Sequence, residues 1–240
     1  MSWWKCRHEE TIAKRLIRLT ILPLKLPKLY PITDARLTGL SHAEQIARLS
    51  DGGATFVQLR EKHLAPGEFY REAEAALKIA RARGVRLIIN DRADIALALR
   101  ADGVHLGQDD LPPEAARRLL GDSAIIGFST HTVEQARAAA HLPVDYIAIG
   151  PVFQTSSKEN PDPVIGLDGL RRVRAEIGGM HLIAIGGIAH LNIRDTLQAG
   201  ADSVAMIDSL LAGNPLEIAA RIAAFLDTLE NKENLAHVKD

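Results

Sequence analysis

From residue 29 onward, short β-rich runs alternate with helical stretches, and we count eight such pairs along the chain. A strand followed by a helix, repeated many times, is typical of right-handed βαβ crossovers on a parallel sheet. The predicted strands are 29–33, 56–60, 87–90, 103–106, 125–129, 146–150, 182–186 and 203–207. The predicted helices are 41–51, 66–83, 93–100, 112–120, 133–140, 167–176, 192–199 and 215–229.

Eight strand-helix units in roughly 200 residues predict closure into a (β/α)8 TIM barrel, an α/β fold that typically needs about 250 residues. The whole chain has 240 residues. A doubly wound open sheet uses the same elements and is the alternative. Helix-start residues support the boundaries, because Ser41, Thr132 and Asn214 each precede a helical run and Pro215 follows at the first helical position.

Both ends of the chain lie outside the repeats. Residues 1–28 are a predicted N-terminal extension, with helical spacing from Glu10 to Leu22 that ends at Pro23. Three interpretations stay open: the extension covers the bottom of the barrel, packs on a partner subunit of a homo-oligomer, or reflects an upstream start codon that the cell does not use. Residues 29–229 are the predicted catalytic barrel, and 230–240 are a polar tail expected to fray.

The overall charge and the cysteine content exclude several classes of partner. With 29 basic and 30 acidic residues the formal net charge is −1, so no global field recruits nucleic acid or an anionic membrane. No apolar run approaches the ~18 residues that span a bilayer. Cys6 is the single cysteine, which excludes an intramolecular disulfide and a zinc site with several thiolates. We therefore expect a cytoplasmic protein that binds neither nucleic acid nor membranes.

The second predicted strand carries charge on one face. Side chains of a strand alternate between its two faces, so Gln58, Arg60 and Lys62 share one face. Two interpretations fit this strand alone. It is either a sheet edge whose polar face is in water, or an inward face whose cations meet an anionic partner, because buried unpaired charges cost several kcal/mol each.

Polar residues at the ends of the other strands favour the second interpretation. In a parallel barrel the C-terminal ends of all strands meet at one mouth, where active sites of this fold lie. Six predicted strands end in polar or small residues, among them Asn90 and Asp91, His105 and Asp110, Ser129 and His131, Thr155 to Lys158, and Gly186 with Gly187. This sequence of strand ends predicts a site at the mouth.

The charges at the predicted mouth suit a diphosphate. Asp91 and Asp110 follow neighbouring strands and could share Mg²⁺, which takes one or two carboxylates and keeps other positions for water and phosphate oxygens. Arg60, Lys62 and Lys158 supply positive charge, and Arg suits bidentate phosphate binding. The alternative for Asp91 is an ordinary ion pair with Arg92 or Arg60.

Other features of the mouth are less specific. Gly186 and Gly187 follow the seventh strand, where this fold often binds phosphate, but a tight turn would also require glycine. We expect His105 to point into the mouth and contact a heterocycle, and His131 to orient Ser129 or to cap a strand. No residue stands out as a covalent nucleophile.

Several motifs together resemble the thiamine phosphate synthase family. They are residues 58–62 (QLREK), 89–92 (INDR), 103–110 (GVHLGQDD), 127–132 (GFSTHT), 150–158 (GPVFQTSSK) and 184–188 (AIGGI). The likeness extends from about Leu29 to Leu229, in order and with similar spacing.

The resemblance implies a reaction and a set of roles. It implies a transferase that joins 4-amino-2-methyl-5-hydroxymethylpyrimidine diphosphate to a (carboxy)thiazole ethyl phosphate, giving thiamine phosphate and pyrophosphate with Mg²⁺. Arg60, Lys62, Ser129 and Lys158 would be catalytic, and the metal would be bound by Asp91 and Asp110. The pyrimidine diphosphate would be bound by Gln58, Arg60, Lys62, Asn90, His105, Ser129 and Lys158. The thiazole phosphate would be bound by Thr155, Ser156, Ser157, Gly187, Ile207 and Asp208.

Three positions, Asp109, Ser157 and Asp208, depart from the family pattern, and Asp208 leaves alternatives open. Asp208 stands where the family usually has Ser, and a carboxylate there would repel a phosphate unless it turns away to cap the next helix. The competing functions are a thiazole tautomerase on the same barrel, which would not need the complete diphosphate site, and a barrel that binds phosphate ligands without catalysis.

Overall fold

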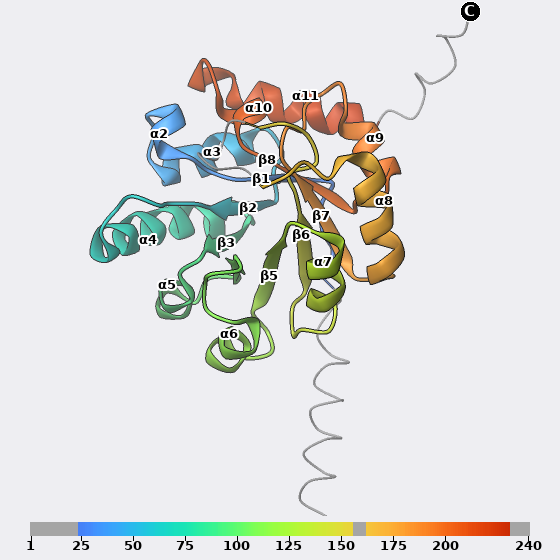
Figure 1. Ribbon diagram of the computed structural model, residues 1–240. Coiled ribbons are helices and arrows are strands. Elements are labelled where there is room, and N and C mark those ends of the chain that lie inside the picture. The colour runs from blue at the N-terminus through green and yellow to red at the C-terminus, as the bar shows by residue number, and fades with distance from the viewer. Residues whose placement is uncertain (1–23, 156–161, 231–240) are drawn as a thin grey trace, which may run out of the picture.

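The computed structural model describes residues 24–155 and 162–230, and in this part of the chain eight strands lie at the centre with helices around them (Figure 1). The strands are β1 (Leu29–Pro31), β2 (Phe56–Leu59), β3 (Arg86–Asn90), β4 (Gly103–Leu106), β5 (Ile125–Thr130), β6 (Tyr146–Ile149), β7 (His181–Ile185) and β8 (Ser203–Met206). The predicted helix at residues 10–22 and the tail at 231–240 lie outside the described residues.

The strands close into a barrel rather than an open sheet. They form one parallel sheet in the order β1-β8-β7-β6-β5-β4-β3-β2. Ile32 then forms a parallel bridge with Gln58, and the Thr33 N–H donates to the Gln58 carbonyl at 2.9 Å, so that β1 meets β2. The predicted α/β TIM-barrel class is confirmed, and the doubly wound alternative is wrong.

The helices surround the strands. They are α2 (Ala35–Thr38), α3 (His42–Asp51), α4 (Pro66–Ala82), α5 (Ala93–Leu99), α6 (Pro113–Leu120), α7 (Val133–Ala139), α8 (Gly166–Ile177), α9 (Ile193–Gln198), α10 (Asp208–Leu211) and α11 (Ile218–Glu230), with a 3₁₀ turn η1 (Pro215–Glu217) before α11. The short α2 and α10 were not predicted, because four residues are too few for a hydrophobic period to be visible.

Local hydrogen bonds explain where several helices begin. The Ser41 side chain accepts from the Glu44 N–H in a capping box, and the Thr132 side chain accepts from the Gln135 N–H. Asn214 caps η1, with Pro215 at its first position. These three predicted helix starts are confirmed, and each satisfies a backbone donor that a helix end leaves without an intrahelical partner.

Alternation along each strand produces two cores. On β2, Val57 and Leu59 pack in the large cluster between the strands and the helices, whereas Phe56 belongs to a smaller cluster inside the barrel. The inner cluster also contains Tyr30, Tyr146 and Ile183, and Leu24 and Leu26 pack against it. Residues 24–28 are thus in contact with the barrel that follows. Among the described residues, no helix is both long and apolar enough to cross a membrane.

Candidate active site

A cavity of about 710 Å³ opens at the C-terminal ends of the strands. Twelve of the predicted site residues line it: Gln58, Arg60, Lys62, Asn90, Asp91, His105, Asp110, Ser129, Thr155, Gly187, Ile207 and Asp208. Ser156, Ser157 and Lys158 lie outside the described residues, so their predicted roles are not tested. The barrel therefore brings together side chains from most of its strands, as the strand-end pattern predicts.

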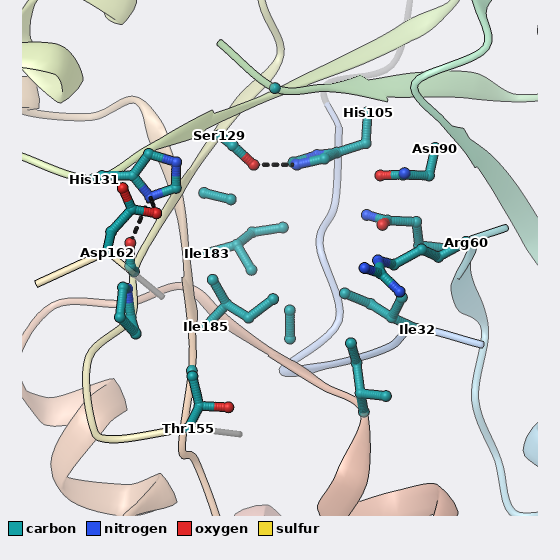
Figure 2. Close-up of a pocket in the computed structure, with 18 of the residues that line it drawn as sticks. Ile32, Arg60, Asn90, His105, Ser129, His131, Thr155, Asp162, Ile183 and Ile185 are labelled. Carbon is teal, nitrogen blue, oxygen red and sulfur yellow. Dashed lines mark hydrogen bonds and ion pairs between the residues drawn. The ribbon is translucent and has the colours of Figure 1, made fainter. Parts of the chain in front are cut away.

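The cavity has an apolar side and a polar side. Figure 2 shows Ile32, Ile183 and Ile185 opposite Ser129, His105 and Asn90. Apolar walls with a few polar groups are typical of sites that bind a small organic ligand. The flat faces of a heterocycle fit such walls.

Asp91 lies at the charged rim of this cavity. It follows β3 with a left-handed backbone conformation (φ 62°), which Asp tolerates better than most residues. Its carboxylate forms an ion pair with the Lys62 ammonium. Asp110, whose carboxylate accepts the Gly107 N–H at 2.7 Å, lies near enough to affect its titration.

The pKa of Asp91 shows that its charge is only partly compensated. Burial raises this pKa above the ordinary value and Lys62 opposes the rise, whereas Asp110 adds to it through a side-chain hydrogen bond and through repulsion between like charges. Two carboxylates close together and short of positive charge favour a cation between them. Among the described residues no group of three His, Cys, Asp or Glu side chains gathers, so a metal here would need ligands from water or substrate.

The ion pairs proposed as alternatives for Asp91 are not formed. Arg92 instead pairs with Asp94, with its Nε 2.8 Å from the Asp94 Oδ1. Arg60 lies 3.7 Å from the Asp34 carboxylate, and both side chains are about one quarter exposed. Arg60 and Lys62 both remain on the cavity wall, with Lys62 in contact with Asp91.

Asn90 presents a buried donor to the cavity. Its side chain is 6% exposed, and its Nδ2 has no hydrogen-bond partner among the described residues. An unpaired buried amide costs free energy, so such a group is rarely retained without a partner. A ligand acceptor in the cavity would supply that partner.

The two histidines of the mouth make different contacts. His105 lines the cavity, but its Nε2 lies 2.8 Å from the Ser129 Oγ and its ring stacks on Tyr146. His131 does not orient Ser129; its Nδ1 lies 2.7 Å from the Gly150 carbonyl oxygen and 3.3 Å from the Asp162 carboxylate. The residue that orients Ser129 is therefore His105.

A second buried histidine supports the loop that carries Arg60 and Lys62. The His42 Nδ1 lies 2.8 Å from the Thr33 Oγ1, and its Nε2 lies 3.3 Å from the Glu61 carboxylate. The Thr33 Oγ1 also accepts the Arg60 N–H at 3.2 Å.

Glu61 completes this support as a carboxylate. Burial alone would raise the pKa of Glu61, but hydrogen bonds from the His63 N–H, from His42 and from the Leu64 N–H outweigh it and hold this pKa below its ordinary value. An ionised Glu61 accepts from His42, so the residues on both sides of Lys62 are fixed by hydrogen bonds.

Gly186 and Gly187 are required by close packing. Both have positive φ, and a Cβ on Gly187 would lie 2.3 Å from the Gln154 carbonyl oxygen. At Gly186 a Cβ would lie 2.6 Å from the Pro151 Cα. The turn explanation therefore suffices for both glycines, and a phosphate role for Gly187 remains a proposal.

Asp208 does not occupy the cap position of the next helix. Ile207 occupies the cap position of α10, no side chain makes a cap hydrogen bond there, and Asp208 is the first helical residue. Asp208 remains partly exposed on the cavity wall, which Gly187 also lines.

Several known proteins have sequences similar to this chain. The sequence model of the thiamine monophosphate synthase family matches residues 29–210. A thiamine-phosphate synthase from Chloroflexus aurantiacus is 44% identical over 195 residues, covering 81% of this chain and 89% of the relative. Another, from Koribacter versatilis, is 49% identical over 193 residues, covering 78% and 90%. The chain belongs to the thiamine monophosphate synthase family.

A solved structure with the same fold supports the membership. Thiamine phosphate pyrophosphorylase from Pyrococcus furiosus superposes with a TM-score of 0.73 and 34% identity, covering 84% of this chain and 96% of that chain. The range matched by the thiamine monophosphate synthase family, 29–210, contains every predicted site residue from Gln58 to Asp208.

Several polar residues that support the site in this family member were missed from sequence. They are Tyr30, Thr33, His42, Glu61 and Tyr146. Tyr30 and Tyr146 fall within predicted strands. Tyrosine is common in strands, so its presence there does not indicate a functional site. The same period-two alternation that we used for residues 58–62 could have been used for β1 and β6. It would have identified hydroxyls that face the inside of the barrel.

Proposed function

We propose that this chain is a thiamine phosphate synthase that condenses an aminopyrimidine diphosphate with a thiazole ethyl phosphate. The observation that carries the proposal is the convergence at one cavity of two cations, two carboxylates and an unpaired buried amide donor. These are Arg60, Lys62, Asp91, Asp110 and Asn90. Family membership and the identity to two named synthases support the same reaction.

The diphosphate would lie at the charged rim. Arg60 and Lys62 provide positive charge for its oxygens, Asn90 and Ser129 provide neutral donors, and Lys158 would add a further cation. Asp91 and Asp110 fit Mg²⁺, because that ion needs few protein carboxylates. When bound there, the ion would neutralise charge on the departing pyrophosphate.

The pyrimidine ring would lie deeper, against the isoleucines. Gln58 is 3% exposed and His105 is 7% exposed, so both belong to the inner part of the cavity. Apolar Ile183 and Ile185 offer a surface for the ring faces. Gln58 lies deep in the cavity and Lys62 lies at its rim. This order matches a ligand whose ring lies deep and whose diphosphate lies at the rim.

The thiazole phosphate would bind between the loop after β6 and the turn after β8. Thr155, Gly187 and the Ile207 to Asp208 turn line that part of the cavity, and Ser156 and Ser157 would complete it. The two phosphate regions use different elements, so two ligands can be held at once with their reacting atoms between them.

The reaction that we propose needs no nucleophilic side chain. The bond between the exocyclic carbon and the diphosphate oxygen breaks with both electrons leaving on oxygen, and the electron-rich aminopyrimidine stabilises the resulting cation. The thiazole nitrogen then donates its lone pair to that carbon. Arg60, Lys62, Ser129 and Lys158 would act by stabilising the charge that develops on the leaving group, which is electrostatic preorganisation.

The full set of diphosphate-binding residues favours a synthase over the tautomerase, because an isomerase of the thiazole would not use them. The test is to incubate the purified protein with both substrates and Mg²⁺ and to follow thiamine phosphate. Formation of thiamine phosphate only when both substrates are present is expected. Isomerisation of the thiazole alone would favour the tautomerase, and binding without turnover would favour the non-catalytic barrel.

A further inference from the structure

Five side chains, four of them buried and Ser129 partly buried, form a continuous hydrogen-bond chain across the inside of the barrel. The Gln58 Nε2 lies 3.2 Å from the Tyr30 hydroxyl oxygen, which lies 3.0 Å from the Tyr146 hydroxyl oxygen. That oxygen lies 3.0 Å from the His105 Nδ1, and the His105 Nε2 lies 2.8 Å from the Ser129 Oγ. The chain begins and ends at residues that line the cavity.

The first hydrogen bond fixes the direction of the next two. An amide nitrogen can only donate, so the Tyr30 oxygen accepts from Gln58 and its own O–H must donate to Tyr146. Burial raises the pKa of both tyrosines well above the ordinary value, so each is a neutral phenol with one hydrogen to donate. Tyr146 accepts from Tyr30 and therefore donates to His105.

The direction of the chain then fixes the tautomer of His105. Because Tyr146 donates to Nδ1, that nitrogen carries no hydrogen. A neutral imidazole has one N–H, so Nε2 carries the hydrogen and donates it to the Ser129 Oγ. The Ser129 hydroxyl accepts from His105 and keeps its own hydrogen for another acceptor.

We propose that this chain presets the two polar ends of the cavity, with Ser129 as a hydroxyl donor and the Gln58 side-chain carbonyl as an acceptor. Tyr30 and Tyr146 are then positioning residues that act through their neighbours. A donor at Ser129 suits an anionic diphosphate oxygen, and an acceptor at Gln58 suits the exocyclic amine of an aminopyrimidine. The identity of this ligand rests on the proposed function, whereas the direction of the chain does not.

The opposite direction makes a different and measurable prediction. If the Gln58 amide were turned over, each of the four hydrogen bonds would reverse, and His105 would carry its hydrogen on Nδ1. Ser129 would then be an acceptor toward the cavity, which would repel an anionic group. The tautomer of one histidine thus reports the direction of the whole chain.

The first test is the nitrogen NMR spectrum of the wild-type protein with ¹⁵N-labelled histidine. The resonances of His105 are identified by their loss in a His105→Gln variant. We expect the pattern of the Nε2–H tautomer in the protein without ligand. An Nδ1–H tautomer, or a mixture of the two, would overturn the proposal. This result is independent of activity, so failure of the proposed function would leave it intact.

The second test compares two hydroxyl deletions. Tyr146→Phe removes the middle of the chain, and Tyr70→Phe removes the hydroxyl of a helix α4 tyrosine that contacts Glu74 at the surface. We expect Tyr146→Phe to raise KM for the pyrimidine diphosphate about tenfold, the order of one hydrogen bond to a charged group, and to leave KM for the thiazole phosphate unchanged. Tyr70→Phe should change neither.

The spectrum of the same variant completes the comparison. In Tyr146→Phe the His105 signals should become a mixture of tautomers, because Tyr146 no longer donates to Nδ1 and the Ser129 hydroxyl can either accept from Nε2 or donate to it. An unchanged tautomer together with an unchanged KM for the pyrimidine diphosphate would overturn the positioning role of Tyr146. Equal losses of affinity for both substrates would overturn it as well, since they indicate a general structural effect.

Discussion

Asp91 combines a left-handed backbone conformation, an ion pair with Lys62 and a second carboxylate nearby. Each of these features makes sense if the residue shares a cation with Asp110. Its raised pKa means that the folded protein without metal binds a proton at Asp91 more readily than the unfolded chain does. The stability contributed by this group is thus present at low pH and is lost as the pH rises through the folded pKa.

Asp91→Asn tests the metal role, because asparagine also tolerates the left-handed conformation. With Mg²⁺ and inorganic pyrophosphate at about 100 times its dissociation constant, the free energy of unfolding of the wild type should rise by ~2.7 kcal/mol. For a domain of this size, each kcal/mol shifts Tm by about 2–4 °C, so Tm should rise by about 5–10 °C. The variant should lose most of this shift without unfolding earlier than the wild type in metal-free buffer. Thermal unfolding measures the ligand-dependent shift and the Tm in metal-free buffer. A full ligand-dependent shift in the variant would contradict the metal role of Asp91.

Asp94→Asn is the matched control for that measurement. Asp94 lies three residues further on, in the first turn of α5, where it pairs with Arg92. Its loss changes the charge of the protein equally but leaves the cavity intact. The control should keep the full ligand-dependent shift.

The pH dependence of metal binding follows from the same carboxyl group. A protonated Asp91 cannot bind Mg²⁺, so affinity should fall as the pH is lowered through its pKa, by about tenfold per unit below it. Because that pKa is raised, the fall should begin at a higher pH than for an ordinary aspartate. Calorimetric titrations at several pH values measure the fall, and an affinity that stays constant down to the ordinary aspartate range would exclude the role.

Asp208 provides a test at the other end of the cavity. Its carboxylate lies on the wall that we assign to the thiazole phosphate. Asp208→Ser removes a like charge, so KM for that substrate should be unchanged or lower by up to about tenfold. Steady-state kinetics give the answer. A large loss of activity would mean that the carboxylate has a positive role in the reaction.

At the scale of elements, the turn from β2 to α4 is held by groups from α3 and from the residues after β1. Arg60, Glu61 and Lys62 follow β2 directly. Thr33 accepts the Arg60 N–H, and His42 contacts both the Thr33 hydroxyl and the Glu61 carboxylate. The support is buried, since Thr33 is 0% exposed and His42 is 1% exposed. A change there should therefore be felt at the cavity, although neither side chain lines it.

Thr33→Val removes the hydroxyl at nearly constant shape. It leaves the Arg60 N–H and the His42 Nδ1 without their partner, so the free energy of unfolding should fall by about 1–3 kcal/mol. Affinity for pyrophosphate with Mg²⁺ should fall as well. Urea unfolding and calorimetric titration measure the two effects. Thr33→Ser keeps the hydroxyl and should retain pyrophosphate affinity; equal affinities in all three proteins would refute the support.

The structure of β2 and of the turn that follows it can be predicted from sequence only in part. Alternation correctly placed Gln58 on the inner face of β2, because a period of two depends on local geometry alone. The partners of its neighbours could not be predicted, since Thr33 and His42 come from other elements and meet Arg60 and Glu61, respectively, only after the barrel closes. The same limit explains why Arg92 and Arg60 were the partners considered in the alternative for Asp91, whereas the ion pair is formed with Lys62.

At the scale of the whole molecule, parallel strands and closure explain why residues distant in sequence share one cavity. Gln58 and Asp208 are far apart in the sequence, yet β2 and β8 both flank β1 and both residues line the mouth. The mouth was predictable because strand direction alone decides which ends converge. The hydrogen-bond chain from Gln58 to Ser129 was not, because its order depends on distances across the barrel interior.

Turnover of Lys62→Ala tests the central claim, that charges at this mouth drive the departure of pyrophosphate. The matched control is Lys78→Ala, on the exposed face of α4. With both substrates and Mg²⁺, the rate of thiamine phosphate formation by Lys62→Ala should fall by about two orders of magnitude or more, because stabilisation of developing charge is lost. Lys78→Ala should match the wild type. A Lys62→Ala variant that turns over as fast as its control would contradict the account.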